Sequence, residues 1–101
     1  MVGRRDAKHD IPGRPLDLYK ANLTRANIVG ANLRRAYLRR VELIGADLIG
    51  AILAETDLID VNLHHANLTG ADPTGAMWTE GSPVPEGWKL DSGSGRLTRR
   101  Q

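Results

Sequence analysis

The sequence of 101 residues predicts an all-β fold in which a short unit repeats around one axis. From Leu16 to Glu80 the chain divides into thirteen consecutive five-residue units, which we call pentads, with no break in register. The third position of a pentad is Leu or Ile in eleven of the thirteen, the first is Ala in nine, and the second is Asn or Asp in nine. Five pentads end in glycine. Repetition at a fixed period indicates a repeat architecture.

A period of five excludes a single regular element as the source of the pattern. On an α-helix five residues turn through about 500°, which spreads the leucines around the whole cylinder. On a flat strand an odd period puts successive leucines on opposite faces. A chain that turns a corner after each pentad can instead direct positions one and three toward one axis, and glycine suits a corner that needs a positive φ. A helical alternative remains because Leu and Ala favour helices, although the recurrent Gly, Asn and Asp oppose it.

The chain divides into three predicted parts. Residues 1–15 are polar and basic and predict a flexible or capping lead-in, in which Ile11 is the side chain that would cover the open end of the repeats. Residues 16–80 form the repeat domain, in which position three of each pentad points inward, and Pro73 takes such a position without being part of the leucine ladder. These predicted core residues are Leu18, Leu23, Ile28, Leu33, Leu38, Leu43, Leu48, Leu53, Leu58, Leu63, Leu68 and Trp78.

Residues 81–101 predict a C-terminal cap that contains a β-hairpin. The repeat pattern ends with Pro73, which has no N–H to donate, and Trp78, which replaces leucine as the last inward side chain. Two short runs, Trp88–Leu90 and Arg96–Thr98, then flank the turn-forming stretch Asp-Ser-Gly-Ser-Gly. We expect the hairpin to cover the exposed edge of the last coil with its apolar side chains, which are Trp88, Leu90 and Leu97.

The consensus A-N/D-L-x-x, as in ANLTR, ANLRR and ADLIG, resembles the pentapeptide-repeat family. The resemblance covers residues 16–80, about two thirds of the chain. It implies a right-handed quadrilateral β-helix with four pentads per coil, in which the central Leu and the small first residue point inward. Thirteen pentads then give a solenoid of about three coils. The segment Gly81–Trp88 also resembles the Pro-x-Gly-aromatic stretch that often follows these repeats.

The net charge of +2 is the sum of a basic segment, an acidic segment and two flanks, residues 1–15 and 81–101, that contribute +2 each. Residues 16–40 carry a net charge of +5, whereas residues 41–80 carry seven acidic side chains and no Lys or Arg. In the twenty-residue register that the resemblance implies, opposite charges face each other across adjacent coils, at Arg35 and Glu55 and at Arg40 and Asp60. The arginines are either a solvated, internally paired face or a patch that holds an acidic protein surface, formed by Arg34, Arg35, Arg39 and Arg40. We do not expect nucleic acid, because base stacking needs aromatic platforms and only Tyr37 lies nearby.

Position four should face solvent, yet it carries four large aliphatic side chains, which are Val29, Ile44, Ile49 and Ile59. In the twenty-residue register Val29 and Ile49 stack on one face, and a clustered apolar patch indicates an interface with a partner or with a second copy. The alternative is scatter, since isolated exposed aliphatic side chains need no partner. The interface hypothesis predicts that Ile44→Lys with Ile49→Lys converts an associated species into a monomer.

The sequence offers no catalytic centre. The absence of cysteine excludes disulfides, thiolate metal sites and a cysteine nucleophile. All three serines lie in the C-terminal tail, and neither a G-x-S-x-G elbow nor a phosphate-binding loop is present. His64 and His65 fall on outward positions, where their side chains should diverge. A metal site there is the alternative, but the favoured interpretation is two exposed histidines, because no third ligand lies at a fixed spacing. We therefore expect a protein that is not an enzyme and that carries no metal or cofactor.

The resemblance implies two functions. The best-known activity of the family is DNA mimicry, in which long acidic rods bind bacterial type II topoisomerases and protect or inhibit them. This chain departs from that pattern, because it has about three coils and arginines that interrupt its acidic surface. The favoured hypothesis is a non-enzymatic interaction module that presents rigid β faces to a protein partner, which the sequence does not identify, or to a second copy, as a homodimer. Topoisomerase mimicry is the alternative.

Two further expectations concern the setting of the chain. Eleven Arg against three Lys is typical of a bacterial genome rich in G and C. The sequence holds neither an apolar run long enough to span a membrane nor the apolar h-region of a signal peptide. We therefore expect a cytoplasmic protein of bacterial origin that does not bind a membrane.

Overall fold

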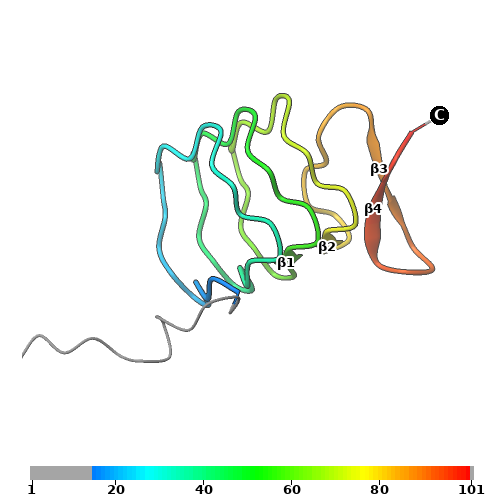
Figure 1. Ribbon diagram of the computed structural model, residues 1–101, viewed down its shortest axis with the longest axis horizontal. Helices are drawn as coiled ribbons and strands as arrows, with labels where there is room; N and C mark the ends of the chain where they lie inside the picture. Colours follow the sequence, from blue (N-terminus) through cyan, green and yellow to red (C-terminus); the bar gives the residue numbers. More distant parts are fainter. Residues whose placement is uncertain (1–14, 101) are drawn as a thin grey trace, which may run out of the picture.

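The structure is a computed structural model that describes residues 15–100. Within this range the chain forms no helix, and its strands are short: β1 (Asp57–Leu58), β2 (Met77–Trp78), β3 (Trp88–Asp91) and β4 (Arg96–Arg99). The repeat region winds as stacked coils of isolated β-bridges and turns, with the β3–β4 hairpin at one end (Figure 1). The all-β prediction is confirmed. Of the predicted lead-in, residues 1–15, only Pro15 lies within the described range, and Ile11 lies outside it.

Parallel bridges join residues that lie twenty positions apart. Over the described residues they form four ladders, and each ladder runs through position two of every fourth pentad. Ladder A joins residues 17, 37, 57 and 77, and ladder B joins residues 22, 42 and 62. Ladder C joins residues 27, 47 and 67, and ladder D joins residues 32, 52 and 72. The chain therefore passes the same side of the molecule once every four pentads.

Three backbone hydrogen bonds connect a pentad with its neighbour in the next coil, as the pair 31–35 and 51–55 shows. Position three donates to the carbonyl of position two, with 2.8 Å between Leu33 N and Ile52 O. Position five donates to the carbonyl of position four, with 2.9 Å between Arg35 N and Ala54 O. In the opposite direction, position two donates to the carbonyl of position one, with 2.8 Å between Ile52 N and Ala31 O. Each pentad thus offers two N–H groups and one carbonyl toward its C-terminal side.

The corners lie at position five. In the pentads that end at residues 20 to 75 this residue has a positive φ of 59° to 70°, and seven of these twelve residues are not glycine. The Asn or Asp at position two supports the corner by accepting a hydrogen bond from the N–H of position four, as from Arg34 to Asn32 Oδ1 at 3.1 Å. Asn and Asp side chains commonly bond to the backbone two residues on in this way. The second and fifth positions of the consensus therefore both serve the turn.

Positions one and three fill the core. Nine predicted core residues are buried, from Leu33 through Leu68 together with Trp78, and Leu38, Leu43 and Leu48 are at most 1% exposed. Leu18, Leu23 and Ile28 are only half-buried. They belong to the first coil, and no described residue stacks on its N-terminal side. The core is therefore closed in the second and third coils and more open at the first.

Two antiparallel strands close one side of the C-terminal end. Strand β4 pairs with β3 and, on its other edge, with β2, so that the sheet order is β1-β2-β4-β3. The strands lie where the sequence predicts a hairpin. Trp88 and Leu97 are 7% and 1% exposed, whereas Leu90 is half-buried. The indole of Trp78 is also buried, and its Nε1 donates to Pro83 O at 3.1 Å.

Candidate interaction surfaces

An apolar strip runs along ladder C. Val29 and Ile49 occupy position four of adjacent coils and are 51% and 38% exposed. A backbone hydrogen bond of 2.8 Å from Gly30 N to Ile49 O fixes their relative position. The neighbouring corner consists of Gly30, Gly50 and Gly70 and carries no side chain. We call these five residues the apolar strip, because the bare corner leaves the two aliphatic side chains accessible from the side.

The other two aliphatic candidates lie on different sides of the molecule. Ile44 belongs to the ladder B side and Ile59 to the ladder A side, and both are half-buried. Position four is thus not uniformly exposed, as Ala54 shows most clearly at 4% exposure. The structure brings Val29 and Ile49 together but does not join Ile44 and Ile59 to them in one patch.

Two of the four candidate arginines are engaged in ion pairs. Arg35 Nε lies 3.0 Å from Glu55 Oε1, as the register predicts, and Arg39 Nη2 lies 3.0 Å from Asp57 Oδ2. The predicted pair of Arg40 with Asp60 is wrong, because no ion pair joins these two described residues. The aspartate side chain is one methylene shorter than that of Glu55 at the equivalent position. Arg40 and Asp60 instead line an open polar hollow with Lys20 and Glu42.

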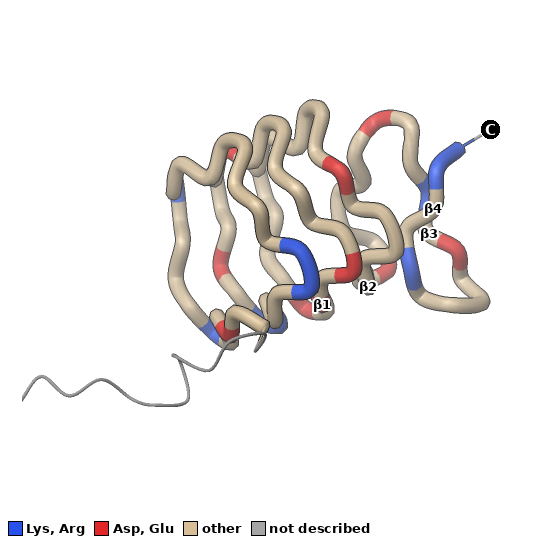
Figure 2. Tube along the Cα trace, viewed as in Figure 1, with Lys and Arg blue, Asp and Glu red and all other residues tan. Residues whose placement is uncertain are grey.

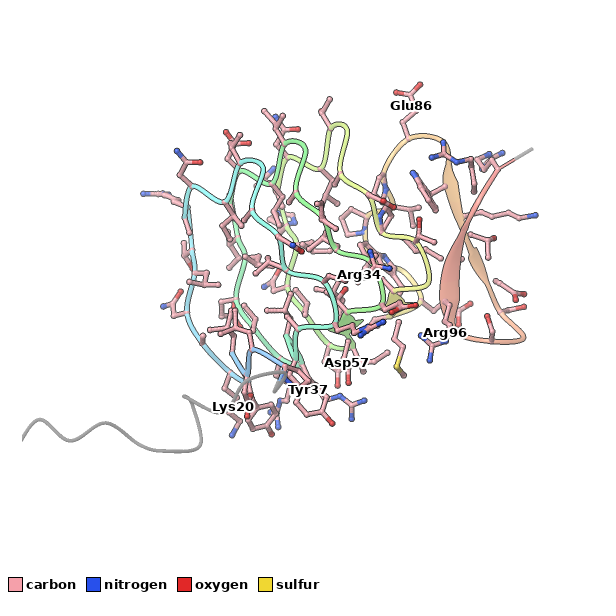
Figure 3. All side chains as sticks on the ribbon, viewed as in Figure 1. Lys20, Arg34, Tyr37, Asp57, Glu86 and Arg96 are labelled. Atoms are coloured by element: carbon pink, nitrogen blue, oxygen red, sulfur yellow. The ribbon has the colours of Figure 1, made fainter. Side chains whose placement is uncertain are left out.

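The two perturbed carboxylates have local causes. The hydrogen bond from Arg35, together with its charge, lowers the pKa of Glu55, and the charges of Arg34 and Arg96 act in the same direction. The hydroxyl and the N–H of Thr74 both donate to Asp72 and lower the pKa of that carboxyl. Figure 3 labels Arg34 and Arg96, which come from the repeats and from β4. Both carboxylates therefore favour the charged form and stabilise turns and coil contacts.

Two exposed tyrosines share a hollow on the ladder A side. Tyr19 and Tyr37 are 51% and 55% exposed and line a hollow of about 260 Å³ with Asp17 and Arg39. Lys20 Nζ lies 5.5 Å from the centroid of the Tyr19 ring. The expectation that only Tyr37 lies near the arginines is therefore wrong. The twenty-residue register predicts that Tyr19 and Tyr37 are neighbours. Tyr19 is at position four of one pentad, and Tyr37, eighteen residues later, is at position two of the pentad stacked on it.

A larger groove, which the sequence did not indicate, lies at the C-terminal end of ladder C. It is a hollow of about 580 Å³ between the pentad Ala66–Gly70 and the loop Pro83–Glu86, and we call it the C-terminal groove. Val84 is 38% exposed, whereas Pro85 is buried. Glu86 extends from this loop on the side of the molecule opposite to Lys20 and Tyr37 in Figure 3.

The adjacent histidines do not diverge as predicted. The ring centroids of His64 and His65 are 4.1 Å apart, with the planes tilted by 56°. His65 sits at a corner with φ of 61°, which turns its side chain away from the alternating directions of a flat strand. Among residues 15–100, no group of three His, Cys, Asp or Glu side chains is placed to hold a metal ion.

Charges follow the sequence in bands along the molecule. Figure 2 shows Lys and Arg on the first coils and on the hairpin, with acidic residues between them. Arg96 lies in the hairpin, at the start of β4, and its Nη1 donates to Gly75 O at 2.6 Å. Basic residues therefore flank the acidic stretch of residues 41–80 on both sides.

A family model of pentapeptide repeats matches residues 17–53 and 56–77, with eight copies of the repeat. The crystal structure of the pentapeptide repeat protein Rfr23 from the cyanobacterium Cyanothece 51142 is similar, with 37% identity, a TM-score of 0.37 and coverage of 69% of this chain. The chain spans 40% of the length of that protein. The pentapeptide repeat protein alr5209 from Nostoc Pcc 7120 has 30% identity and a TM-score of 0.34, over 78% of this chain and 77% of that one. No curated protein matches the chain.

Proposed function

The chain belongs to the pentapeptide-repeat family, and on this premise we propose that it is a non-enzymatic interaction module that presents rigid β faces to a protein partner or to a second copy. The single observation that supports this function best is the apolar strip. Val29 and Ile49 are large aliphatic side chains that lie exposed in adjacent coils, and the glycine corner beside them puts no side chain in the way. An exposed apolar surface with a fixed backbone is typical of a protein interface.

The finer architecture is part of the same proposal. We assign the repeat region to a right-handed quadrilateral coil of about three turns, with residues 81–101 as its cap. The bridges between residues twenty apart support four sides per turn, and the positive φ at every fifth residue supports a corner after each pentad. Such a scaffold keeps surface side chains at the spacing of β-strands, about 4.8 Å between adjacent coils. A partner therefore meets a surface that is formed before binding.

Light scattering on the purified chain and on Val29→Lys with Ile49→Lys tests the function. We expect the parent to associate and the variant to be a monomer, because two lysine ammonium groups cannot be buried in an apolar contact without a large desolvation cost. The sequence-based hypothesis pairs Ile44 with Ile49. We substitute Val29 instead of Ile44, because Val29 lies on the same ladder as Ile49. The repeat fold tolerates the change, since both side chains project from exposed positions.

The matched control is Thr24→Lys with His64→Lys. These residues occupy position four of two coils on the ladder B side and are exposed, so the control adds the same two charges at the same repeat position. The control should associate as the parent does. A parent that is monomeric over the whole concentration range, or a control that dissociates as the strip variant does, would contradict self-association through the strip.

A further inference from the structure

The C-terminal edge of ladder C has an open set of backbone groups. In the preceding coil, Leu48 N donates to Asn67 O at 2.8 Å, Gly50 N donates to Thr69 O at 2.9 Å, and Ala46 O accepts from Asn67 N at 2.9 Å. The equivalent groups one coil later are the N–H of Leu68, the N–H of Gly70 and the carbonyl of Ala66. None of the three has a hydrogen-bond partner among residues 15–100. Unpaired groups at a β edge are a template for another strand.

The hairpin closes other parts of this end. On ladder A, Trp78 N donates to Gly95 O at 2.9 Å, and Ala76 O accepts from Leu97 N at 2.9 Å. On ladder D, Pro73 has no N–H, and Gly75 N donates to Leu97 O at 3.3 Å. The ends of ladders B and C are left open in the part of the chain that the structure describes. Ladder C differs from ladder B because the C-terminal groove lies in front of its open edge.

The loop that forms the far wall of the groove does not complete the ladder. Pro83 and Pro85 have no N–H, and their carbonyls are already engaged, Pro83 O with Trp78 Nε1 and Pro85 O with Trp88 N, each at 3.1 Å. Two buried tryptophans thus hold the wall in place while the edge opposite keeps its groups free. An occupant must therefore bring its own backbone carbonyls and N–H to satisfy the edge.

We propose that the C-terminal groove binds an extended peptide segment of a partner protein as an added parallel strand on ladder C. Two carbonyls of the segment accept from Leu68 and Gly70, and one N–H of the segment donates to Ala66, as in every coil above. Val84 offers an apolar contact to a side chain of the segment, and Glu86 on the rim selects a basic residue. This inference deepens the proposed function and rests on it, since it names one class of partner and where that partner docks.

The first test selects random peptides displayed on phage against the full chain and measures the affinity of the best synthetic peptide by fluorescence anisotropy. Leu68→Pro removes one donor of the edge and breaks no hydrogen bond within residues 15–100. Pro73, at position three of the next pentad, shows that the fold accepts proline at this position. We expect the affinity to fall about tenfold, the usual order for a lost hydrogen bond in a binding site.

The matched control is Leu63→Pro on ladder B. Leu63 and Leu68 are 3% and 8% exposed, and the N–H of Leu63 is likewise without a partner among the described residues, but Leu63 does not line the C-terminal groove. Peptide affinity should be unchanged in this variant. Equal loss in both variants, or equal binding by Leu68→Pro and the parent, would overturn the proposal.

Two further measurements leave the protein sequence unchanged. A peptide that is N-methylated at the residue facing Ala66 should lose binding, and the amides of Leu68 and Gly70 should exchange more slowly with solvent when the unmodified peptide is bound. A selection that enriches no peptide, or enriched peptides that protect neither amide, would also overturn the inference. The strip variant Val29→Lys with Ile49→Lys should still bind the peptide. Association through the strip without peptide binding would therefore refute the groove alone and leave the proposed function standing.

Discussion

Twelve of the thirteen pentads turn their corner at a residue with a positive φ, and the cost of that conformation depends on the residue that adopts it. Five corners use glycine, which reaches this region without strain, whereas residues such as Arg25 and His65 adopt it with a full side chain. A left-handed conformation costs a residue other than glycine about 1–2 kcal/mol. The ladder hydrogen bonds on both sides of the corner, together with the Asn or Asp at position two, offset this cost.

Gly50 is the cleanest place to measure the corner strain. Its φ is +67°, and a Cβ added there would meet no atom within 4 Å, so that Gly50→Ala introduces backbone strain without a clash. We expect the free energy of unfolding to fall by about 1–2 kcal/mol in urea denaturation. Gly93→Ala is the control, since φ of Gly93 lies outside the left-handed region and its added Cβ would lie 3.6 Å from Asp91 Oδ1. Equal losses in the two variants would rule out φ as the cause.

The ion pair between Arg35 and Glu55 predicts how the carboxyl of Glu55 titrates when Arg35 is replaced. Because Arg35 lowers the pKa of Glu55, Arg35→Gln should raise the pKa of that carboxyl toward its ordinary value, as measured by NMR. A depressed pKa stabilises the fold above the unfolded pKa of glutamate, about 4.3, and this contribution is lost as the pH falls through the folded pKa. The stability difference between parent and variant should therefore vanish in acid.

Arg40→Gln provides the matched control for this titration. Arg40 occupies the equivalent corner one pentad later but makes no ion pair with Asp60, and it is not among the groups that shift Glu55. The pKa of Glu55 should be the same in the control as in the parent. A shift of similar size in both variants would mean that general charge, rather than the contact between Arg35 and Glu55, sets the pKa.

At the scale of elements, a coil is stable because another coil lies on each side of it. Leu48, in the second coil, is fully buried, whereas the equivalent Ile28 of the first coil is half-buried. The hairpin has the corresponding role at the other end, where β4 pairs with β2 and Leu97 is 1% exposed. Stability should therefore be highest in the middle of the stack, as expected for repeat proteins whose units contact only their neighbours.

Leu48→Ala and Leu18→Ala measure this gradient. Both remove the same atoms from position three, but Leu48 is fully buried and Leu18 is half-buried. We expect a loss of about 2–5 kcal/mol for Leu48→Ala and a clearly smaller loss for Leu18→Ala, because a cavity forms only where neighbours enclose the site. Urea denaturation at pH 7 gives both values. A larger loss at Leu18 would show that the first coil is packed more tightly than its exposure indicates.

The sequence predicts the repeated elements more completely than it predicts the features of the surface. The five-residue period identifies the inward positions and the stacking of Val29 on Ile49, because the ladder geometry is the same for each pentad. The period also places Arg35 beside Glu55, but it does not encode side-chain length, which separates that pair from Arg40 and Asp60. The C-terminal groove depends on the path of residues 81–87, which lie outside the repeat and are held by hydrogen bonds from Trp78 and Trp88.

At the scale of the whole molecule, the order of charged residues along the chain helps to distinguish an interaction module from a DNA mimic. Residues 41–80 supply seven acidic side chains and no Lys or Arg, which is the only stretch that resembles a polyanion. Two of these acids, Glu55 and Asp57, lie in ion pairs with arginines of the preceding coil. A polyanion mimic needs an uninterrupted negative field, and these pairs interrupt it.

A DNA-gyrase supercoiling assay tests the mimic directly, and a variant with four substitutions sharpens it. We expect the parent to leave supercoiling unchanged at a large molar excess. Replacing Arg34, Arg35, Arg39 and Arg40 by Gln lowers the net charge of residues 16–40 from +5 to +1 and frees Glu55 and Asp57. If mimicry were the function, the parent would inhibit and the variant would inhibit more strongly, because fewer arginines interrupt its negative field. If the arginines instead hold a protein partner, the variant loses that partner while supercoiling is unaffected by either chain.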